Sequence, residues 1–377
     1  MITATYPPSA NGVAVSTLRT VRELRRVGHH VGILGPKTSI VDPDYIAFQT
    51  IRHMPFVPAD YPVIVPLLTP QLIKKLEKIS WDVIHVHHHK PVGSIALALG
   101  KLFHIPVVFT YHTQYDRYIE THAGWIPSIV KKWLYRIAVR NLCVHVNGVI
   151  ATTRWLREVL QRKLPRQNVY YASTAGLESP FAVSVKKQSL RQKYKIPVNG
   201  SVFITVSRLS KEKSISFLIK AFSLWARRHM TGTLIIVGDG PYRGRLEYVV
   251  HKKHLEARIQ FTGKIPNADL GEWYCLANVF LYCSLTDTIG INIIEAMSAR
   301  LPVVARNHIT TREVIRNGFN GILAGKGIKR FVSAMDEAMQ KRTVLSRGAF
   351  EKSKEYMIGK TTTDLVDVYR DVIRRYV

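Results

Sequence analysis

Residues 279–305 read VFLYCSLTDTIGINIIEAMSARLPVVA: an apolar run, a polar loop, a helical stretch and a second β-branched run. Apolar runs that alternate with amphipathic stretches are typical of parallel strands joined by helices. The alternation continues on both sides of this segment and also fills the first half of the chain. It predicts strands near 202–206, 233–237, 259–262, 279–282 and 303–305, and near 2–5, 30–34, 83–87, 107–110 and 148–152. We therefore expect an α/β fold of two doubly wound domains.

The composition fits two globular domains with a strongly basic surface. The 377 residues include 46% hydrophobic ones, enough for two cores at roughly 150 residues per domain. Lys and Arg number 54 against 26 Asp and Glu, which gives a formal charge of +28 and predicts a polyanionic neighbour. No run reaches the roughly 18 apolar residues that span a bilayer. Three cysteines without a C-x-x-C pair support neither a disulfide framework nor a zinc site.

The domain boundary is predicted at a polar, basic stretch around residues 178–199. We expect an N-terminal domain at 1–177, a C-terminal domain at 178–355, and a last helix at 356–377 that packs back toward the N-terminal domain. Open α/β sheets bind ligands outside the carboxyl ends of their strands. The chemistry is therefore expected in a cleft between the two domains, which hinge closure would complete.

The sharpest motif is a pair of acids, Asp287 and Glu295, separated by seven residues. Asp287 lies in the loop after a predicted strand, and Glu295 lies two turns into the next helix. The amides of residues 288–290 would lie at the positive end of that helix, which suits a phosphate. Glu295 is costly to bury unless a hydroxyl, such as that of a ribose, is its partner. The alternative is that Asp287 only caps the helix and that Glu295 is a paired surface acid.

Two further loops follow predicted strands and open helices. Arg208 and Lys213, in SRLSKEK (207–213), are spaced so that both cations can converge on one diphosphate. Gly12, in PPSANGV (7–13), allows backbone amides to approach a phosphate closely. The alternatives are a solvated basic loop in the first case and a turn without a ligand in the second.

Together these motifs resemble the retaining GT-B glycosyltransferases of glycosyltransferase family 4, over essentially the whole chain. The family's Glu-x7-Glu pattern reads Asp287-x7-Glu295 here. The resemblance implies a nucleotide-diphosphate sugar as donor, with Asp287 at the sugar hydroxyls, Glu295 at the ribose and the two cations at the diphosphate. The donor-binding residues that it implies are Gly12, Arg208, Lys213, Ile265, Thr288, Ile289, Gly290, Ile291 and Glu295. Ser214 and Arg300 replace glycines that are usual in the family, so altered turns are expected at both.

The resemblance also implies that His112, in FTYHTQY (109–115), contacts the donor sugar and is important for turnover. We take His112 and Asp287 as the catalytic residues. The run at 85–89, HVHHH, looks like a metal site, but consecutive strand residues point to opposite faces. We therefore expect no metal site, with His87 or His88 lining the acceptor site. No cofactor is expected, because the nucleotide sugar is a co-substrate and a divalent cation need not have protein ligands.

A basic helical stretch follows the His112 loop. Its apolar residues fall at 126, 129, 130, 133, 134, 137 and 138, in a helical series that cations border. Such a helix can lie in the interface of an anionic membrane. The membrane-binding residues predicted are Trp125, Ile129, Lys131, Lys132, Trp133, Arg136 and Arg140. The alternative is a helix packed in the core whose rim is basic.

Within family 4, the His112 loop followed by such a helix resembles the membrane-associated diacylglycerol glycosyltransferases. The resemblance implies a hexosyltransferase that acts on a lipid hydroxyl, such as that of a diacylglycerol, and retains the anomeric configuration. No secretory signal opens the sequence, so we expect a cytoplasmic protein on the inner face of the cell membrane. One alternative is a soluble family-4 enzyme that acts on a sugar or a small metabolite. The other is a nucleic-acid-binding protein, against which no recognised nucleic-acid motif is found; we expect no nucleic-acid partner.

Overall fold

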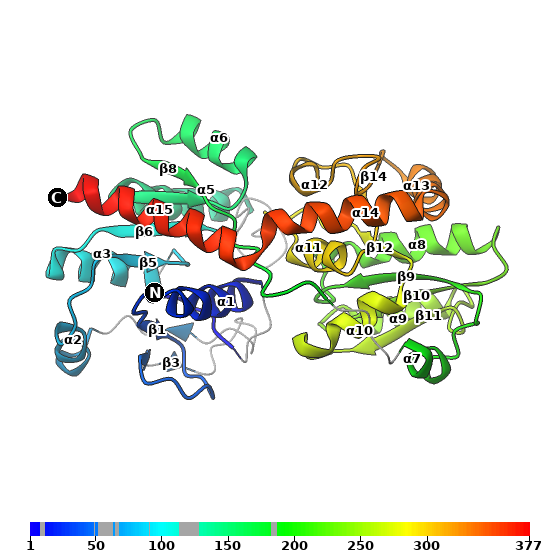
Figure 1. Cartoon of the computed structure of the whole chain (residues 1–377), viewed down its shortest axis with the longest axis horizontal. Helices are drawn as coiled ribbons and strands as arrows, with labels where there is room; N and C mark the ends of the chain where they lie inside the picture. Colours follow the sequence, from blue (N-terminus) through cyan, green and yellow to red (C-terminus); the bar gives the residue numbers. More distant parts are fainter. Residues whose placement is uncertain are drawn as a thin grey trace. The chain divides into compact units, whose positions relative to one another are not determined.

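The computed structural model describes residues 1–7, 12–48, 50–51, 63–64, 68–89, 91–112, 128–181 and 187–377 (Figure 1). The chain forms two compact units. One comprises Met1–Glu178 together with Ile358–Val377, and the other comprises Ser179–Met357. Within the described ranges, no helix combines the length and the apolar character that crossing a bilayer requires.

The unit of residues 179–357 is built on a six-stranded parallel sheet. Its strands are β9 (Ser201–Val206), β10 (Gly232–Val237), β11 (Ile259–Gly263), β12 (Val279–Tyr282), β13 (Val303–Arg306) and β14 (Gly321–Ala324). They lie in the order β11-β10-β9-β12-β13-β14, and every neighbouring pair is parallel. The order turns back between β9 and β12, which makes the carboxyl ends of these two strands the switch point where ligands bind in such sheets.

Helices cover both faces of this sheet. They are α7 (Lys187–Lys193), α8 (Ile215–Ala226), α9 (Arg243–His251), α10 (Leu270–Leu276), α11 (Ile291–Ser298), α12 (Ile309–Val314), α13 (Ile328–Gln340) and α14 (Arg342–Ser353). Phe222 of α8 and Phe331 of α13 share a core with Phe203 of β9. On the other side, α10 packs against β9, and α11 packs against β12 and β13. The strands are therefore buried on both faces, as their nearly continuous apolar runs require.

The other unit has a second parallel sheet. Its strands β5 (Ile84–Val86), β6 (Val107–Tyr111), β7 (Gly148–Ala151) and β8 (Val169–Tyr171) lie in this order, and β1 (Ile33–Gly35) pairs with β2 (Tyr45–Ala47). Ile2 bridges Leu34 of β1 and Val86 of β5. The strand predicted at residues 2–5 is thus reduced to one bridging residue, which still joins the two groups of strands. An antiparallel pair, β3 (Thr50–Ile51) and β4 (Val63–Ile64), completes the unit.

The helices of this unit are α1 (Gly12–Arg26), α2 (Pro70–Glu77), α3 (Val92–Phe103), α5 (Ser128–His145), α6 (Arg154–Lys163) and α15 (Ile358–Tyr376). Phe109 of β6 faces a core shared with α3, α5 and α6. Its neighbour Val108 faces the other way, toward Leu365 and Val372 of α15. The chain's last helix, red in Figure 1, therefore covers one face of this sheet and packs beside α1.

The two positions where glycine was expected keep the geometry that glycine would give. Ser214 has φ 56° and Arg300 has φ 62°, both in the left-handed region. This conformation costs a residue with a Cβ roughly 1 kcal/mol or more. Both residues thus adopt a conformation that glycine takes without strain, and their side chains are accommodated at a backbone cost.

Candidate functional site

The loops that leave β9 and β12 bring their functional side chains together at the switch point. Lys213, at the end of a short 3₁₀ turn after β9, donates to Asp287, in the loop after β12, with Nζ 2.5 Å from Oδ1. Tyr282, the last residue of β12, donates to the other carboxylate oxygen, Oδ2, at 2.5 Å. We call Lys213, Asp287 and Tyr282 the ionic cluster. Lys213 and Asp287, 74 residues apart, meet only because β9 and β12 are neighbours.

Within the ionic cluster, Asp287 is ionised at neutral pH and Tyr282 is protonated. Burial alone would raise the pKa of Asp287, but the charge of Lys213 and hydrogen bonds from Lys213, Tyr282 and Ser284 leave this pKa below its ordinary value. Burial and the adjacent carboxylate hold the pKa of Tyr282 well above its ordinary value, so its hydroxyl remains a donor. The side chains of Lys213 and Asp287 are 21% and 25% exposed. The pair is therefore held by the protein and still open to a ligand.

Glu295, the second acid of the motif, is buried at 6% exposure, so its interpretation as a surface acid is wrong. Its Oε2 accepts a hydrogen bond of 3.1 Å from the hydroxyl of Tyr274 in α10. The hydroxyl partner that burial demands is thus supplied by the protein itself. Asp287 does not cap the next helix either, because the N-cap of α11 is Gly290.

The start of α11 is held against the carboxyl end of β9. The side-chain amide of Asn292 donates from Nδ2 to the carbonyl of Val206 at 2.5 Å. A Cβ at Gly290 would lie 3.1 Å from the Tyr282 hydroxyl and 2.9 Å from Ile293, so a side chain there would crowd the ionic cluster. Thr288 and Ile289 are buried, and Ile291 is half-buried. The helix end that was predicted to receive phosphate thus stands beside Asp287.

The Arg208 loop is supported by the glycine-rich turn after β10. Gly238 has φ 128°, and a Cβ there would lie 2.0 Å from the carbonyl oxygen of Ser207, so only glycine fits. The amide of Leu209 donates to the carbonyl of Asp239 at 2.9 Å. Arg208 is half-buried, as is Ile265 in the loop after β11. Both lie after the carboxyl ends of their strands, on the edge that carries the ionic cluster.

The other unit gathers imidazoles at its own switch point, where Ile2 and β5 are neighbours. His87 follows β5 and His112 follows β6, and their Nδ1 and Nε2 atoms lie 2.9 Å apart. His85 lies between the hydroxyls of Tyr369 and Thr110, at 2.6 Å from each. We call His85, His87 and His112 the imidazole cluster. Gly12, the exposed first residue of α1, belongs to the same unit.

The imidazole cluster is neutral at pH 7. Burial lowers the pKa of His112 to about 3, and it holds the pKa values of His85 and His87 well below the ordinary range. His88 points elsewhere: its Nδ1 accepts from the amide of Ala4 at 3.1 Å, and burial lowers its pKa to about 3. In the described ranges, no three His, Cys, Asp or Glu side chains are arranged to hold a metal ion.

Helix α5 exposes an apolar stripe among cations. Trp133 is 60% exposed and Ile137 is 48% exposed, and Arg136 and Arg140 beside them are exposed too. The same helix is anchored in the core by a different stripe, formed by Val139, Leu142, Cys143 and Val146. Trp133 and Ile137, two residues of the predicted apolar face, are thus exposed rather than packed in the core, and membrane binding stays a prediction. Trp125 lies outside the described residues, as do the side chains of Ile129, Lys131 and Lys132.

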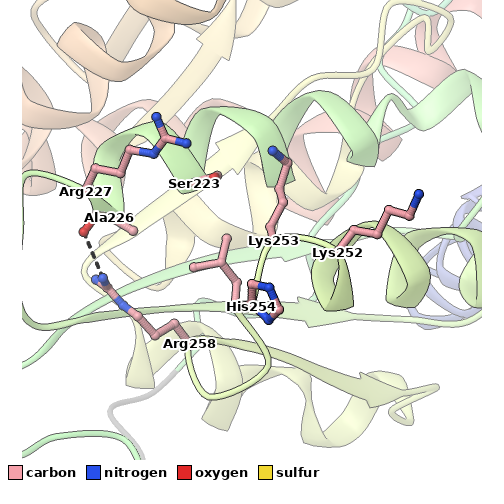
Figure 2. A pocket seen from close by; sticks show the side chains of 8 residues that line it. Ser223, Ala226, Arg227, Lys252, Lys253, His254 and Arg258 are labelled. Atoms are coloured by element: carbon pink, nitrogen blue, oxygen red, sulfur yellow. Dashed lines mark hydrogen bonds between the residues drawn. The ribbon is translucent and has the colours of Figure 1, made fainter.

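A basic pocket of about 350 Å³ lies at the opposite edge of the six-stranded sheet (Figure 2). It is lined by the last turn of α8 and by residues that follow α8 and α9. These segments precede β10 and β11, so the pocket lies at the amino ends of the strands. Arg258 donates to the carbonyls of Ala226, His229 and Gly232, and Lys252 and Lys253 follow α9. Cations stabilise helix carboxyl ends, which accounts for this cluster without a ligand.

Four polar residues of these sites were not singled out from the sequence: Tyr282, Tyr274, Asn292 and Tyr369. Tyr282 ends an apolar strand and reads as a core residue. The other three lie on helices remote in sequence from the groups that they contact. The one signal in the sequence was that Tyr282 places a hydroxyl at the carboxyl end of a buried strand.

Comparisons with known proteins agree with this arrangement. Residues 10–173 match the family described as Glycosyltransferase Family 4, and residues 186–357 match Glycosyl transferases group 1. The alpha-monoglucosyldiacylglycerol synthase of Acholeplasma laidlawii is 27% identical over 98% of this chain and 95% of its own length. The enzyme of the same name from Streptococcus pneumoniae is 26% identical over 86% of this chain and 74% of its own.

The fold is shared with solved glycosyltransferase structures. HepE of Anabaena, in complex with UDP and glucose, has a TM-score of 0.74 at 18% identity, over 98% of this chain and 99% of its own. The predicted GT-B class, with two Rossmann-like domains, is confirmed, and so is the prediction of an enzyme. The chain belongs to the group 1 glycosyltransferases of glycosyltransferase family 4 and is a hexosyltransferase.

Proposed function

We propose that this enzyme transfers a hexosyl group from a nucleotide-diphosphate sugar to the hydroxyl of a lipid, such as a diacylglycerol, and retains the anomeric configuration. It would work at the cytosolic face of a membrane to which α5 binds. The observation that carries the donor side is the ionic cluster at the switch point. The names of two relatives, both glucosyldiacylglycerol synthases, support the lipid acceptor.

Each group of the site has a chemical task in this proposal. Arg208, Lys213 and the amino end of α11 neutralise the donor diphosphate, whose charge grows as it leaves. Asp287 accepts hydrogen bonds from the sugar hydroxyls, while Lys213 and Tyr282 hold it in place. His112 contacts the same sugar. Glu295 accepts from the ribose in addition to Tyr274.

The reaction is a substitution on one face of the sugar. The acceptor oxygen bonds to the anomeric carbon as the bond from that carbon to the diphosphate oxygen breaks on the same side. The acceptor proton passes to the leaving diphosphate oxygen, so no protein base is required. The residues contribute position and charge complementarity, which commonly account for much of the rate in such transfers.

The membrane part of the proposal rests on the exposed stripe of α5. A soluble protein gains nothing from leaving Trp133 and Ile137 in water, whereas an interfacial helix buries such side chains among lipids. Arg136 and Arg140, as exposed cations beside the stripe, would face anionic headgroups. Each cation near such a surface contributes about 1 kcal/mol.

A donor screen followed by product analysis tests the activity. Purified enzyme is incubated with UDP- and GDP-hexoses and with diacylglycerol in mixed vesicles, and products are identified by mass and anomeric configuration by NMR. We expect an α-linked hexosyl lipid from an α-linked donor. Transfer to free sugars with no transfer to lipid would overturn the lipid assignment, and an inverted product would overturn retention.

Vesicle flotation tests membrane binding separately. The double variant Arg136→Gln with Arg140→Gln should weaken binding to vesicles of phosphatidylglycerol and phosphatidylcholine by about tenfold to thirtyfold, from the loss of two cations. Lys74→Gln with Lys75→Gln is the matched control, since both lysines are exposed on α2 of the same unit. Equal losses in the two double variants would mean that net charge, not α5, attracts the membrane.

A further inference from the structure

His87 lies in the middle of the imidazole cluster and is itself 3% exposed. Its Nδ1 is 2.9 Å from Nε2 of His112, and its ring centroid is 4.1 Å from that of His85. Its other nitrogen, Nε2, is buried and has no hydrogen-bond partner among the described residues. Among the described residues, the one hydrogen bond of the His87 side chain is therefore the one with His112.

The side of the His87 ring that packs on His85 is fixed in place. His85 has both nitrogens engaged, by Tyr369 from α15 and by Thr110 from β6. Val86, between the two histidines, is fully buried against the opposite core. The His87 ring is thus packed on one side by a fixed imidazole, and it can hold its neighbour His112 in one orientation.

One hydrogen joins the two rings, so their tautomers are coupled. If His87 carries its proton on Nδ1, it donates to Nε2 of His112, whose own proton is then on Nδ1. If His87 is protonated on Nε2 instead, a buried N–H is left without a partner, and His112 Nδ1 becomes an acceptor. A buried N–H without a partner is rarer than an unfilled acceptor. The geometry therefore favours the first arrangement.

We infer that His87 is a positioning residue that fixes the orientation and tautomer of His112, with the proton of His112 on Nδ1. The inference rests on the proposed role of His112 at the donor sugar. Because Nε2 of His112 then accepts from His87, this nitrogen does not serve as a base, which agrees with a reaction in which the leaving diphosphate takes the proton.

The surroundings of His87 allow this role over a wide pH range. The titratable groups near it are His85 and His88 on its own segment, His112 directly after β6 and the amino group of Met1. Burial lowers the pKa of each of these groups, so none adds a positive charge at pH 7. Tyr369, the hydroxyl that reaches His85, has its pKa raised by burial and remains protonated.

Three substitutions of His87 separate positioning from packing. Asn places its amide near the position of Nδ1 and can keep the bond to His112, Gln reaches toward the position of Nε2, and Leu fills space without a bond. We expect His87→Leu and His87→Gln to lower kcat by about tenfold or more with the donor KM within threefold, since one directed bond is lost. We expect His87→Asn to recover kcat to within threefold. His104→Asn, at the exposed end of α3 in the same unit, should leave kcat within twofold.

A measurement without turnover completes the test. With ¹⁵N-labelled histidine, NMR of the full chain should show Nε2 of His112 as a nitrogen without a proton in the wild type and in His87→Asn, and a mixed state in His87→Leu. Equal loss of kcat in the Asn, Gln and Leu variants would overturn positioning by a hydrogen bond. If His87→Leu does not fold, the comparison of Asn with Gln carries the same test.

The same variants distinguish failure of the inference from failure of the proposed function. If His112→Ala abolishes transfer and His87→Leu does not alter kcat, His112 acts alone and the inference is wrong. If His112→Ala transfers at the wild-type rate, the proposed role of His112 is wrong. In that case, the NMR spectra still show whether His87 sets the tautomer.

Discussion

In the unit of residues 179–357, the polar groups at the switch point are charged: Lys213 and Asp287 form an ion pair that Tyr282 supports. In the other unit, the groups at the corresponding point are imidazoles that burial keeps neutral. The topological position is the same, because in both sheets the strand order turns back there. The difference shows that one fold can place charged groups at this point in one half and uncharged hydrogen-bonding groups in the other.

The largest effect is expected from breaking the ion pair. Lys213→Ala and Asp287→Ala should each lower kcat/KM at least a hundredfold. Each substitution removes a charged side chain that we propose to bind the donor, and it leaves the other member of the ion pair without its partner. Steady-state transfer from the preferred nucleotide sugar measures this. Lys341→Ala, which breaks an exposed ion pair with Glu337 in the same unit, is the control and should change little. Wild-type rates in both site variants would remove the ionic cluster from the reaction.

Mild acid should destabilise the sheet that carries the imidazole cluster and leave the ionic cluster unchanged. The folded pKa values of His88 and His112 are about 3, below the ordinary 6.5, so stability is full above pH 6.5 and falls as pH drops toward 3. At pH 5 the burial of each of these neutral histidines is expected to lower the free energy of unfolding by about 1–2 kcal/mol. Asp287, whose pKa is lowered, should remain ionised there and lose its contribution only when pH falls through that low pKa.

Hydrogen exchange read by mass spectrometry, at pH 7.5 and at pH 5 and corrected for intrinsic rates, measures this separation. Peptides of β5 and β6 should lose protection at pH 5, whereas peptides of β9 and β12 should keep it. Equal loss in the two sheets would mean that the imidazoles do not govern the acid response.

A smaller effect is expected from the hydroxyl that supports Asp287. Tyr282→Phe removes one hydrogen bond to a carboxylate and should lower kcat/KM by about fivefold to thirtyfold, which corresponds to about 1–2 kcal/mol. Because the ion pair remains, the loss should be well below that of Lys213→Ala. Tyr274→Phe, whose hydroxyl contacts Glu295, should act mainly on nucleotide affinity. A loss in Tyr282→Phe as large as that in Asp287→Ala would mean that the hydroxyl, and not the charge, holds the carboxylate.

The smallest effect is expected next to Lys213. Ser214→Gly relieves a left-handed backbone and should raise the free energy of unfolding by about 0.5–1 kcal/mol, as measured with denaturant. Turnover should stay within twofold, since the ion pair does not use this side chain. A tenfold loss of turnover without a change in stability would show that the stiffness of Ser214 helps to hold Lys213.

Much of the fold could be predicted from sequence because its strands are buried on both faces. Runs such as VFITV at 202–206 have no competing helical pattern, and their alternation with helices implies parallel pairing. The strand at residues 2–5 was harder, since a single bridging residue leaves almost no pattern. Helix α5 left two interpretations open, because apolar residues lie on two sides of it and the core buries only one of them.

The site could be predicted as a set of loops but not as a set of contacts. Asp287 and Lys213 follow strands and carry charge, which marks them as candidates. That they form an ion pair depends on β9 and β12 being neighbours, which local pattern does not reveal. The histidine run was recognised as unusual, yet its link to Tyr369 lies 284 residues away along the chain and needs the final helix to be placed.

The placement of α15 has a consequence for the order in which the protein can form. Leu365, Val368 and Val372 complete a core with Val108 and Ile150, strand residues that are synthesised more than 200 positions earlier. During synthesis, the unit of residues 179–357 has all of its own chain available before the first unit does. The nascent first sheet must wait with one apolar face uncovered until the last turns leave the ribosome. A chain released after residue 357 would therefore have a protease-sensitive first unit and a complete second unit.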